Sequence, residues 1–480
     1  MEDKNQSKSN RSISYRNLLG FWKRLTTGSV NRKIFGAAFT VAVFTTVVKA
    51  VSFIKELFIA WKFGTSDDLD AFLIALVVPN LLMNVIGSSL ASAFIPTYIS
   101  VKEKQGQKAS QKLFSGFMTY SLFIIGITTI LMVVIAPIYL SLIGSGFSRE
   151  KLDLTFKLLC CISPFVLLSG IVYVWEAVLN SYEKFAIAAL IPISIPVITI
   201  ILLLSTNSWG IYILPLVLFV GTFIQIIVFG KYLSKQGVLL LPKWYGFSKE
   251  LRQVNRQYLP MVAGAFLLCS AIPVDQAMAA MLSPGSVASL NYGNRVIAAP
   301  MSLITTALTA AIMPYCSRMF ATGDWIGLRN TIRRYLQLIV IGTVPLALIL
   351  FLFSQPIIEL AFQRGSFTSK DTYLVAQIQS LYSLQIPFYI GNLLLIRILS
   401  SIQRNNVLLW ASAFSLLLNI FFNYLLMSLI GIRGIALSTT FKTYSKKKVC
   451  DHFTLLQSYL TVYFVLRYLL TKINKYENEN

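Results

Sequence analysis

Histidine is almost absent from this chain of 480 residues, which contains only one, His452. None of the five cysteines forms a CxxC pair, and most lie in or beside apolar runs, where cysteine acts as a small hydrophobic residue. A His/Cys metal site is therefore not expected, and no other cofactor motif is present. The sequence also lacks a nucleophile elbow, a P-loop and a paired acidic motif. The absence of these motifs argues against an enzyme and against a nucleotide-driven pump.

Charge is scarce, and acidic charge is the scarcest. Charged residues are 13% of the chain, with 42 Lys and Arg against 19 Asp and Glu, which gives a formal net charge of +23. A soluble protein of this charge would suggest nucleic-acid binding, which needs a folded basic surface with interleaved aromatic residues. The basic residues here lie between apolar runs instead, as membrane topology requires. No nucleic-acid partner is predicted.

Long apolar runs are the dominant feature. Hydrophobic residues make up 56% of the chain, and the mean hydropathy is +0.68. Runs of about 18 residues or more can cross a bilayer as helices, and continuous rather than alternating runs exclude a β-barrel. The sequence predicts an all-α polytopic membrane protein. The expected spans are 35–62, 70–100, 113–143, 153–180, 185–205, 209–232, 256–282, 287–317, 333–354, 373–401, 406–430, a weaker one from about 432, and a final apolar run at 453–471.

Basic residues alternate between loops and so predict the orientation. They are frequent in the N-terminal segment and in the second, sixth and eighth loops, whereas the first, fifth and seventh loops are short or poor in them. Because basic loops stay in the cytoplasm, we expect a cytoplasmic N-terminus and twelve spans. The first 33 residues are polar and basic, which does not fit a cleavable signal peptide.

An internal repeat relates the two halves of the chain. One constant offset aligns three turn-forming or polar positions near spans one and two with three near spans seven and eight. They are Gly64, Asp70 and Pro79, matched by Gly285, Asn291 and Pro300. Chance similarity of apolar helices is the alternative. The repeat predicts two parallel six-helix lobes around a central cavity. The expected division is a basic segment 1–34, an N-lobe 35–232, a cytoplasmic linker 233–255, a C-lobe 256–441 and an atypical tail 442–480.

The first span carries charge well inside its apolar stretch, at Lys49, Lys55 and Glu56. Charged residues within a membrane are costly and usually face a cavity or a partner. Lys49 and Lys55 lie roughly 120° apart on a helix, so both can border one wide cavity. Lys55 has an alternative in pairing with Glu56 or a neighbouring carboxylate, although adjacent positions on a helix do not face each other directly. Lys62, nearer the end, is expected to snorkel to the interface.

The second half adds two further polar groups within spans. Asp275 and Arg295 lie in spans seven and eight and either pair with each other or face a polar cavity. With Lys49 and Lys55, Arg295 would line a cavity suited to a phosphate or pyrophosphate. Asn419 and Asn423 share one face of span eleven, where amides join helices; coordination of a small hard cation with Asp275 is the alternative.

Three segments carry a resemblance to a known family. They are FGTSDDLDAFLIALVVPNLL at 63–82, YGNRVIAAPMSLITTALTAAIMP at 292–314 and AFQRGSFTSKDT at 361–372. Together they resemble the MurJ (MviN) family of lipid II flippases, within the superfamily that also holds O-antigen flippases and multidrug antiporters. The resemblance extends over about residues 35–441. It implies up to fourteen helices in two lobes, in the bacterial cytoplasmic membrane, which carry an undecaprenyl-pyrophosphate-linked sugar between leaflets.

The resemblance also assigns roles to residues. It implies that Lys49, Lys55 and Arg295 bind the pyrophosphate, with lysines where the family has first-span arginines. It further implies a sodium site, or coupling to the membrane potential. The sodium ligands would be Asp275, Asn419, Asn423 and Thr439.

The chain departs from the family at four places. Met83 stands where the family has a span-two arginine, and Ser88 stands at an acidic position. A second span-eleven ligand is Asn rather than acidic. FKTYSKKKVCDH interrupts the twelfth span after about ten residues, and one apolar run follows where the family has two. We interpret this tail as frameshifted or truncated.

The sequence thus predicts a lipid II flippase that works by alternating access. The alternatives are a flippase for another lipid-linked oligosaccharide, such as O-antigen, capsule or exopolysaccharide, and a cation-coupled antiporter of the same superfamily. The expected partners are the lipid-linked substrate, membrane lipid and glycan-synthesis machinery. An antiporter for cationic drugs would favour acidic cavity residues, which the basic first span opposes.

Overall fold

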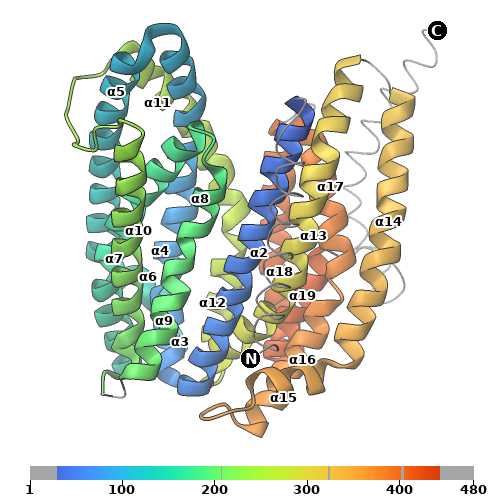
Figure 1. Ribbon diagram of the computed structural model, residues 1–480. Coiled ribbons are helices and arrows are strands. Elements are labelled where there is room, and N and C mark those ends of the chain that lie inside the picture. Colours follow the sequence, from blue (N-terminus) through green and yellow to red (C-terminus); the bar gives the residue numbers. More distant parts are fainter. Residues whose placement is uncertain (1–29, 207, 323–324, 402–404, 444–480) are drawn as a thin grey trace, which may run out of the picture.

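The computed structural model describes residues 30–206, 208–322, 325–401 and 405–443, and all regular secondary structure in these ranges is helical (Figure 1). The predicted apolar run 453–471 and most of the segment 1–34 lie outside the described residues. Among the described helices, seven are long and apolar enough to cross a membrane. One of them, Asp67–Val134, has 68 residues, which is enough for two crossings.

The first half contains the following helices, in chain order. They are α2 (Val30–Phe63), α3 (Asp67–Ala75), α4 (Val77–Leu82), the π-helix η1 (Met83–Gly87), α5 (Ser88–Val134), α6 (Ala136–Ile143), α7 (Arg149–Ser181), α8 (Phe185–Leu190), the 3₁₀-helix η2 (Ile191–Ile193), α9 (Ser194–Ser205), the 3₁₀-helix η3 (Gly210–Tyr212) and α10 (Ile213–Lys235).

The second half begins after a non-helical linker at 236–248. Its helices are α11 (Lys249–Cys269), α12 (Ala271–Ala280), α13 (Ser286–Thr322), α14 (Trp325–Leu352), α15 (Ser354–Phe362), α16 (Ser369–Ser383), α17 (Ile386–Ser401), α18 (Asn405–Ile430) and α19 (Ile432–Thr443). Each span predicted between 35 and 430 coincides with one of these helices or with a consecutive set of them. The predicted loop after span two is a turn at Gly106, whose φ of +81° interrupts α5.

Hydroxyl side chains fix where several helices begin. Ser66, Ser148 and Ser248 each accept a hydrogen bond from the backbone N–H three residues later, at the starts of α3, α7 and α11. Thr368 and Asp371 form a reciprocal capping box at the start of α16. Such caps satisfy backbone donors that the first turn of a helix leaves free. The short turns therefore follow directly from local sequence.

The surface is apolar where a soluble protein would be polar. Large hydrophobic side chains on α5 and α6 are among the most exposed, including Ile130, Val134, Ile138 and Leu142. Several polar groups are buried instead, among them Asp70, Asn419 and Asn423. Lipid tails solvate apolar side chains as well as a protein interior does, so this distribution fits a bundle within a bilayer.

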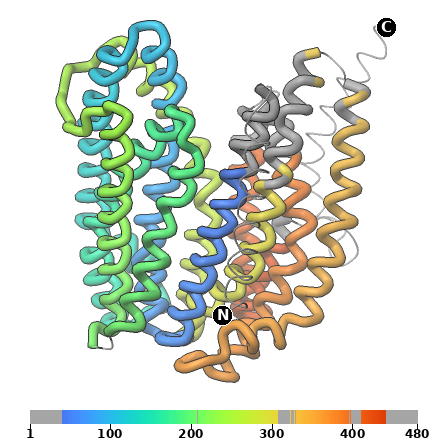
Figure 2. Tube along the Cα trace, viewed as in Figure 1, coloured from blue at the N-terminus to red at the C-terminus, as the bar shows by residue number. Residues whose placement is uncertain are grey.

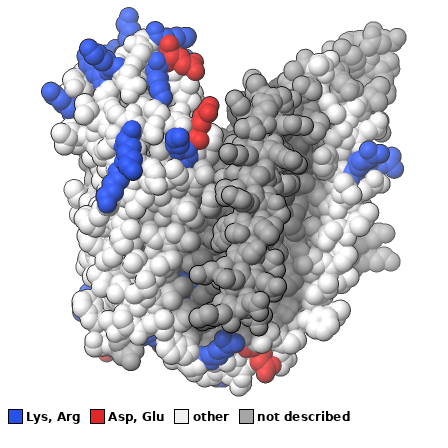
Figure 3. Space-filling model, in the orientation of Figure 1, with Lys and Arg blue, Asp and Glu red and all other residues white. Residues whose placement is uncertain are grey.

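The helices form two groups that meet at one end and diverge at the other (Figures 1 and 2). The meeting end, hereafter the closed end, contains the turns at 64–66, 144–148, 281–285 and 363–368. The other end, hereafter the basic end, contains the turn at Gly106 and the linker 236–248 (Figure 1). Figure 3 shows Lys and Arg side chains gathered at the basic end of the first group. The first residues of α2 also lie at the basic end.

Two segments contact both groups. Helix α2 packs against α8 and α9 of the first half and against α13 of the second. After the linker, α11 packs against α5, whereas α12 packs against α13 and α18. The chain turns between them at Ser270. The packing of α11 on α5 shows that the first part of span seven, predicted to belong to the C-lobe, rests on a helix of the N-lobe.

Candidate functional site

The first candidate site is an ionic cluster between α2 and α13. Lys55 Nζ lies 2.8 Å from Glu56 Oε1, and Arg295 Nε lies 3.4 Å from the same oxygen. Arg295 Nε also donates to Asn291 Oδ1, one turn earlier on α13, at 3.2 Å. The alternative that Lys55 pairs with Glu56 is confirmed, because the long lysine side chain folds back along the helix although adjacent positions do not face each other directly. The carboxylate joins cations from both halves of the chain.

This cluster has an excess of positive charge and a free face. Glu56 is almost buried, with its side chain 10% exposed, but the side chain of Arg295 is 50% exposed. The guanidinium therefore has donors available beyond those facing Glu56 and Asn291. Lys49 lies two turns nearer the basic end of α2, roughly 9 Å along the axis, and is exposed. An anion between the two groups of helices could contact these cations without breaking the fold.

The other first-span and second-span positions have structural roles. Lys62 Nζ donates to the carbonyls of Leu203, at 3.0 Å, and Thr206. A cation there stabilises the C-terminal end of α9. Met83, at the position of the family's arginine, is buried in the apolar core within η1. Ser88 donates to the carbonyl of Asn84 and begins α5.

The second candidate site surrounds Asp275, a buried residue of α12. Its Oδ1 accepts hydrogen bonds from Nδ2 of Asn423 at 2.6 Å and of Asn419 at 3.2 Å, both from α18. Its Oδ2 accepts from Thr439 Oγ1 of α19 at 3.4 Å. The structure therefore brings together all four residues grouped by the sequence. Ser438, which sequence reasoning missed, donates to Asn423 Oδ1 and holds that amide with its nitrogen toward Asp275.

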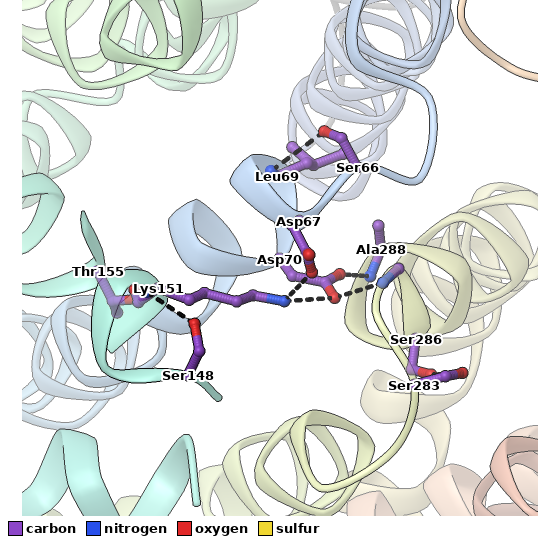
Figure 4. A network of polar contacts seen from close by, with 11 residues as sticks. Ser66, Asp67, Leu69, Asp70, Ser148, Lys151, Thr155, Ser283, Ser286 and Ala288 are labelled. Carbon is purple, nitrogen blue, oxygen red and sulfur yellow. Dashed lines mark hydrogen bonds and ion pairs between the residues drawn. The ribbon is translucent and has the colours of Figure 1, made fainter. Parts of the chain in front are cut away.

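A third polar network closes the molecule at the closed end (Figure 4). Asp70 of α3 is 1% exposed, and its two carboxylate oxygens accept from the backbone N–H groups of Gly285 and Ala288, each at 2.8 Å. These donors begin α13, so the carboxylate caps a helix of the opposite half. Lys151 of α7 lies 3.3 Å from Asp70 and also pairs with Asp67. Sequence reasoning used Asp70 only as a marker of the repeat and missed Lys151.

The turn between α15 and α16 completes this closure. The Ser366 N–H donates to the carbonyl of Trp61 at 2.9 Å, and its hydroxyl donates to that of Lys62 at 3.1 Å, both at the end of α2. Thr65 Oγ1 donates to Asp371, the residue of the α16 capping box. The AFQRGSFTSKDT segment thus has a physical role, because it docks the second half on the end of α2.

Glycines permit the close approach at this end. A Cβ atom on Gly285 would overlap the carbonyl oxygen of Thr65, and one on Gly365 would overlap that of Trp61. A Cβ on Gly64 would overlap the carbonyl of Ser366, and one on Gly146 would lie 2.7 Å from the Cα of Met281. Real Cβ atoms do not approach backbone atoms so closely. The closed end therefore depends on backbone packing that other residues would prevent.

We expect Gly285→Ala to impair closure. The added methyl meets Thr65 across the closed end, and the φ of +81° is unfavourable for any residue with a side chain. The change should abolish function in a growth-complementation assay at normal membrane abundance. Gly431→Ala is the matched control, since Gly431 has a φ of +63° but open space around its Cβ position. Gly431→Ala should therefore lower the free energy of unfolding by only about 1 kcal/mol, through its backbone conformation alone. Equal activity of the two variants would contradict steric closure.

The two sequence repeats meet at the closed end. Gly64 and Gly285 both have positive φ and both follow the helix of a first span, at equivalent places in the two halves. Tyr292 of α13 donates to the carbonyl of Gly64 at 3.1 Å, and Asp70 accepts from Gly285 at 2.8 Å. Each repeat thus holds the glycine turn of the other. This reciprocal arrangement is what parallel repeats around an axis along the membrane normal would produce.

Comparison with known proteins decides the family. The family model described as "Lipid II flippase MurJ" matches residues 59–447. The chain belongs to the MurJ family. The match includes all three segments quoted above, and the predicted membership is confirmed.

Individual relatives agree with membership in the MurJ family. The chain is 26% identical over 405 residues to the "Probable lipid II flippase MurJ" of Buchnera aphidicola subsp. Acyrthosiphon pisum, covering 83% of this chain and 79% of the relative. It is 24% identical over 428 residues to that of Synechocystis sp., covering 86% and 80%.

Solved structures agree on the fold. "Lipid II flippase MurJ, inward closed conformation" matches with a TM-score of 0.74 and 22% identity, over 92% of this chain and 99% of that one. An inward-facing multidrug resistance MATE family transporter of the MOP superfamily matches with a TM-score of 0.72 and 12% identity, over 90% and 99%. The predicted all-α polytopic fold is therefore confirmed.

Proposed function

We propose that this chain moves lipid II across the bacterial cytoplasmic membrane by alternating access. Membership in the MurJ family carries the proposal. The ionic cluster supports it, because Lys55 and Arg295 present positive charge from both halves of the chain near one shared carboxylate. A pyrophosphate headgroup is the kind of anion that a guanidinium and an ammonium bind well together.

Glu56 has a defined part in this mechanism. Without substrate it neutralises part of the charge of Lys55 and Arg295 and keeps both cations oriented between the helices. An arriving pyrophosphate binds the exposed face of Arg295 and can recruit Lys49. The excess of positive charge then favours an anion over a cationic drug. Neutral apolar tails need no such site and stay in the lipid.

The sidedness follows from charge. The basic end would face the cytoplasm, where loops rich in Lys and Arg remain. The structure then corresponds to a state closed toward the outside, with the two halves diverging toward the cytoplasm. Exchange of access requires the contacts of Asp70 with the start of α13, and of Ser366 with the end of α2, to separate while others form at the basic end.

Another lipid-linked oligosaccharide is the second candidate substrate. Met83 is buried in the apolar core where the family has an arginine, and lysines stand at both first-span arginine positions. Lysine keeps the charge but cannot form the bidentate contact of a guanidinium. These replacements leave fewer hydrogen-bond donors for a phosphate group. A headgroup with fewer phosphate oxygens would therefore fit the site.

Complementation distinguishes these substrates. A bacterial strain depleted of its own lipid II flippase would express this chain, and lipid II in the outer leaflet would be measured directly. We expect growth and outer-leaflet lipid II to recover. Recovery of O-antigen or capsule export in a strain lacking that flippase, without recovery of lipid II, would instead support the second candidate. Failure of both at normal membrane abundance would overturn the proposal.

We further propose that the Asp275 cluster binds Na⁺ and couples it to transport. The Asp275 carboxylate, the Thr439 hydroxyl and the amide oxygen of Asn419 are hard oxygen ligands of the kind that small cations prefer. Asn419 Oδ1 is buried without a hydrogen-bond partner in the described part of the chain, and so is available.

We expect Na⁺ to raise the melting temperature of the purified protein, and K⁺ at equal ionic strength to do so less. Asp275→Asn should remove that difference, because it removes the only charged ligand of the cluster while keeping its shape. Asp153→Asn is the control, since Asp153 pairs only on the surface with Lys157. A Na⁺-specific shift that survives in Asp275→Asn would contradict the assignment.

A further inference from the structure

The linker between the two halves exposes apolar side chains outside any membrane span. Leu239 is 68% exposed, Leu241 is 80% exposed, and Trp244, Tyr245 and Phe247 are each 44–52% exposed. Figure 1 shows this segment running over the outer side of the first group of helices at the basic end. A contiguous exposed apolar patch of this kind usually marks an interaction site.

The linker is held in place rather than free. The side-chain amide of Gln111, on α5, donates to the carbonyl of Leu239 at 2.7 Å and accepts from its N–H at 3.0 Å. Val238 is buried, and Leu240 packs near Gly230 of α10. Successive side chains of an extended segment point to opposite sides. Val238 and Leu240 therefore face the protein, while Leu239 and Leu241 are directed outward.

The aromatic residues are fixed as well. Phe247 packs edge-on against Tyr120 of α5, with ring centroids 6.0 Å apart, and against Trp244 at 5.2 Å. Part of the Trp244 ring and part of the Phe247 ring therefore remain exposed at the protein surface. Trp and Tyr are the residues that prefer the boundary between headgroups and acyl chains. Rigid presentation lowers the entropic cost of contacting a partner.

Positive charge surrounds this apolar patch. The ammonium of Lys112 lies 5.3 Å from the centre of the Tyr245 ring, and that of Lys243 lies 5.7 Å from it. Between residues 231 and 256 the only acidic residue is Glu250, against six Lys and Arg. An apolar patch bordered by lysines is complementary to a bilayer surface that contains anionic lipid.

The patch also continues an apolar surface that must already face lipid. Phe219, Phe223 and Ile227 are exposed at four-residue spacing on α10, so they form one stripe along that helix. The linker follows α10 directly, at the end toward which the stripe runs.

We propose that the linker 236–248 is an interfacial anchor, which inserts Leu239, Leu241 and Trp244 into the inner leaflet and binds anionic phospholipid headgroups through Lys235, Lys243 and neighbouring cations. The anchor ties the first half, which carries Gln111, to the cytoplasmic leaflet. The second half can then move relative to a fixed frame. This inference concerns the bilayer and not the transported substrate, so it stands or fails independently of the proposed function.

Quenching of Trp244 fluorescence tests the anchor. The full chain would be reconstituted in two kinds of phosphatidylcholine vesicle. One contains phosphatidylglycerol with brominated acyl chains, and the other contains the same mole fraction of phosphatidylcholine with brominated acyl chains. The signal of Trp244 is the difference between the parent and Trp244→Phe. We expect strong quenching by brominated lipid, and more by brominated phosphatidylglycerol than by brominated phosphatidylcholine at equal mole fraction.

Two controls separate the apolar and charged contributions. The double variant Lys235→Gln/Lys243→Gln should lose the preference for phosphatidylglycerol but should still be quenched by brominated lipid. Each lysine is expected to contribute about fivefold to that preference. Trp209, exposed at the closed end, is a matched tryptophan and should be quenched with little preference between the lipids. Equal quenching of Trp244 by both lipids would overturn the anionic preference. Absence of quenching by brominated lipid would overturn the anchor. In that case, quenching by iodide would show that Trp244 faces water, and protection from iodide would show that a second copy of the chain covers it.

Discussion

Replacing Arg295 with alanine should abolish flipping while leaving the protein inserted and folded. The change removes the exposed guanidinium and leaves Glu56 with only Lys55 as a partner. Truncating one member of a hydrogen-bonded charge pair costs about 2–5 kcal/mol, so substrate affinity should fall roughly 30-fold or more. Outer-leaflet lipid II in the complementation strain is the measurement. Arg333→Ala, at an exposed arginine of α14, should be without effect.

A double variant distinguishes substrate binding from simple neutralisation. If Arg295 serves only to compensate Glu56, then Arg295→Ala combined with Glu56→Gln should recover function, since no uncompensated carboxylate remains. If Arg295 binds the anionic headgroup, the double variant stays inactive, which is our expectation. Lys49→Ala should also abolish flipping, although Lys49 lies apart from Glu56. Normal lipid II export by a Lys49→Ala/Arg295→Ala chain would refute the anion site.

The second large effect is expected at Asp70. Asp70→Asn removes the charge that pairs with partly buried Lys151 and weakens the cap on the backbone of Gly285 and Ala288. Losing a hydrogen bond to a charged group costs about 1.5–3 kcal/mol. The bonds from Gly285 and Ala288 to Asp70 stabilise the closed state specifically, because they join the two halves, whereas Asp70 and Lys151 belong to the same half. The population open at this end should therefore rise by about tenfold to a hundredfold.

Thiol labelling measures that opening. Ser289 of α13 is buried near this network, and its hydroxyl has no hydrogen-bond partner among the described residues, so Ser289→Cys should be tolerated. With the native cysteines replaced by alanine, a membrane-impermeant thiol reagent should label Cys at this position far faster in the Asp70→Asn background.

A matched aspartate provides the control. Asp67, on the same helix, also pairs with Lys151 but is 53% exposed, and an exposed pair is worth about 1 kcal/mol or less. Asp67→Asn should leave the labelling rate close to that of the parent, because Asp67 and Lys151 belong to the same half. Labelling of the Asp70→Asn chain as slow as that of the parent would show that Asp70 does not hold the closed end.

In the proposed mechanism, the Glu56 cluster binds the substrate and the Asp70 network holds the closed end. The Glu56 cluster lies on α2 and α13, and the glycine turns border the same two helices, with Gly64 just after α2 and Gly285 just before α13, roughly two to three turns from the cluster. A shift of α13 relative to α2 would therefore change both the spacing of the cations and the contacts of the closed end. Anion binding can bias closure only to the extent that it differs between the two states.

The sequence alone determined the class of protein, its spans and the main charged members of the Glu56 and Asp275 clusters. Continuous apolar runs can only be membrane helices, and charges within them must have a use, so Lys55, Arg295 and Asp275 could be identified without a fold. The motifs determined the family. The repeat was visible because a turn with positive φ needs glycine at the same place in both halves.

Only the tertiary structure decided which of these charges meet. Arg295 pairs with Glu56 rather than with Asp275, since α13 lies against α2 while Asp275 faces α18 and α19. Asp70, Lys151 and Ser366 act across distances of 80 to 300 residues along the chain, which no local pattern encodes. Lys55 and Glu56 meet because a flexible side chain can bend around its helix, which positions on a helical wheel do not express. Local sequence fixes helices and turns, whereas contacts between distant helices depend on how they pack.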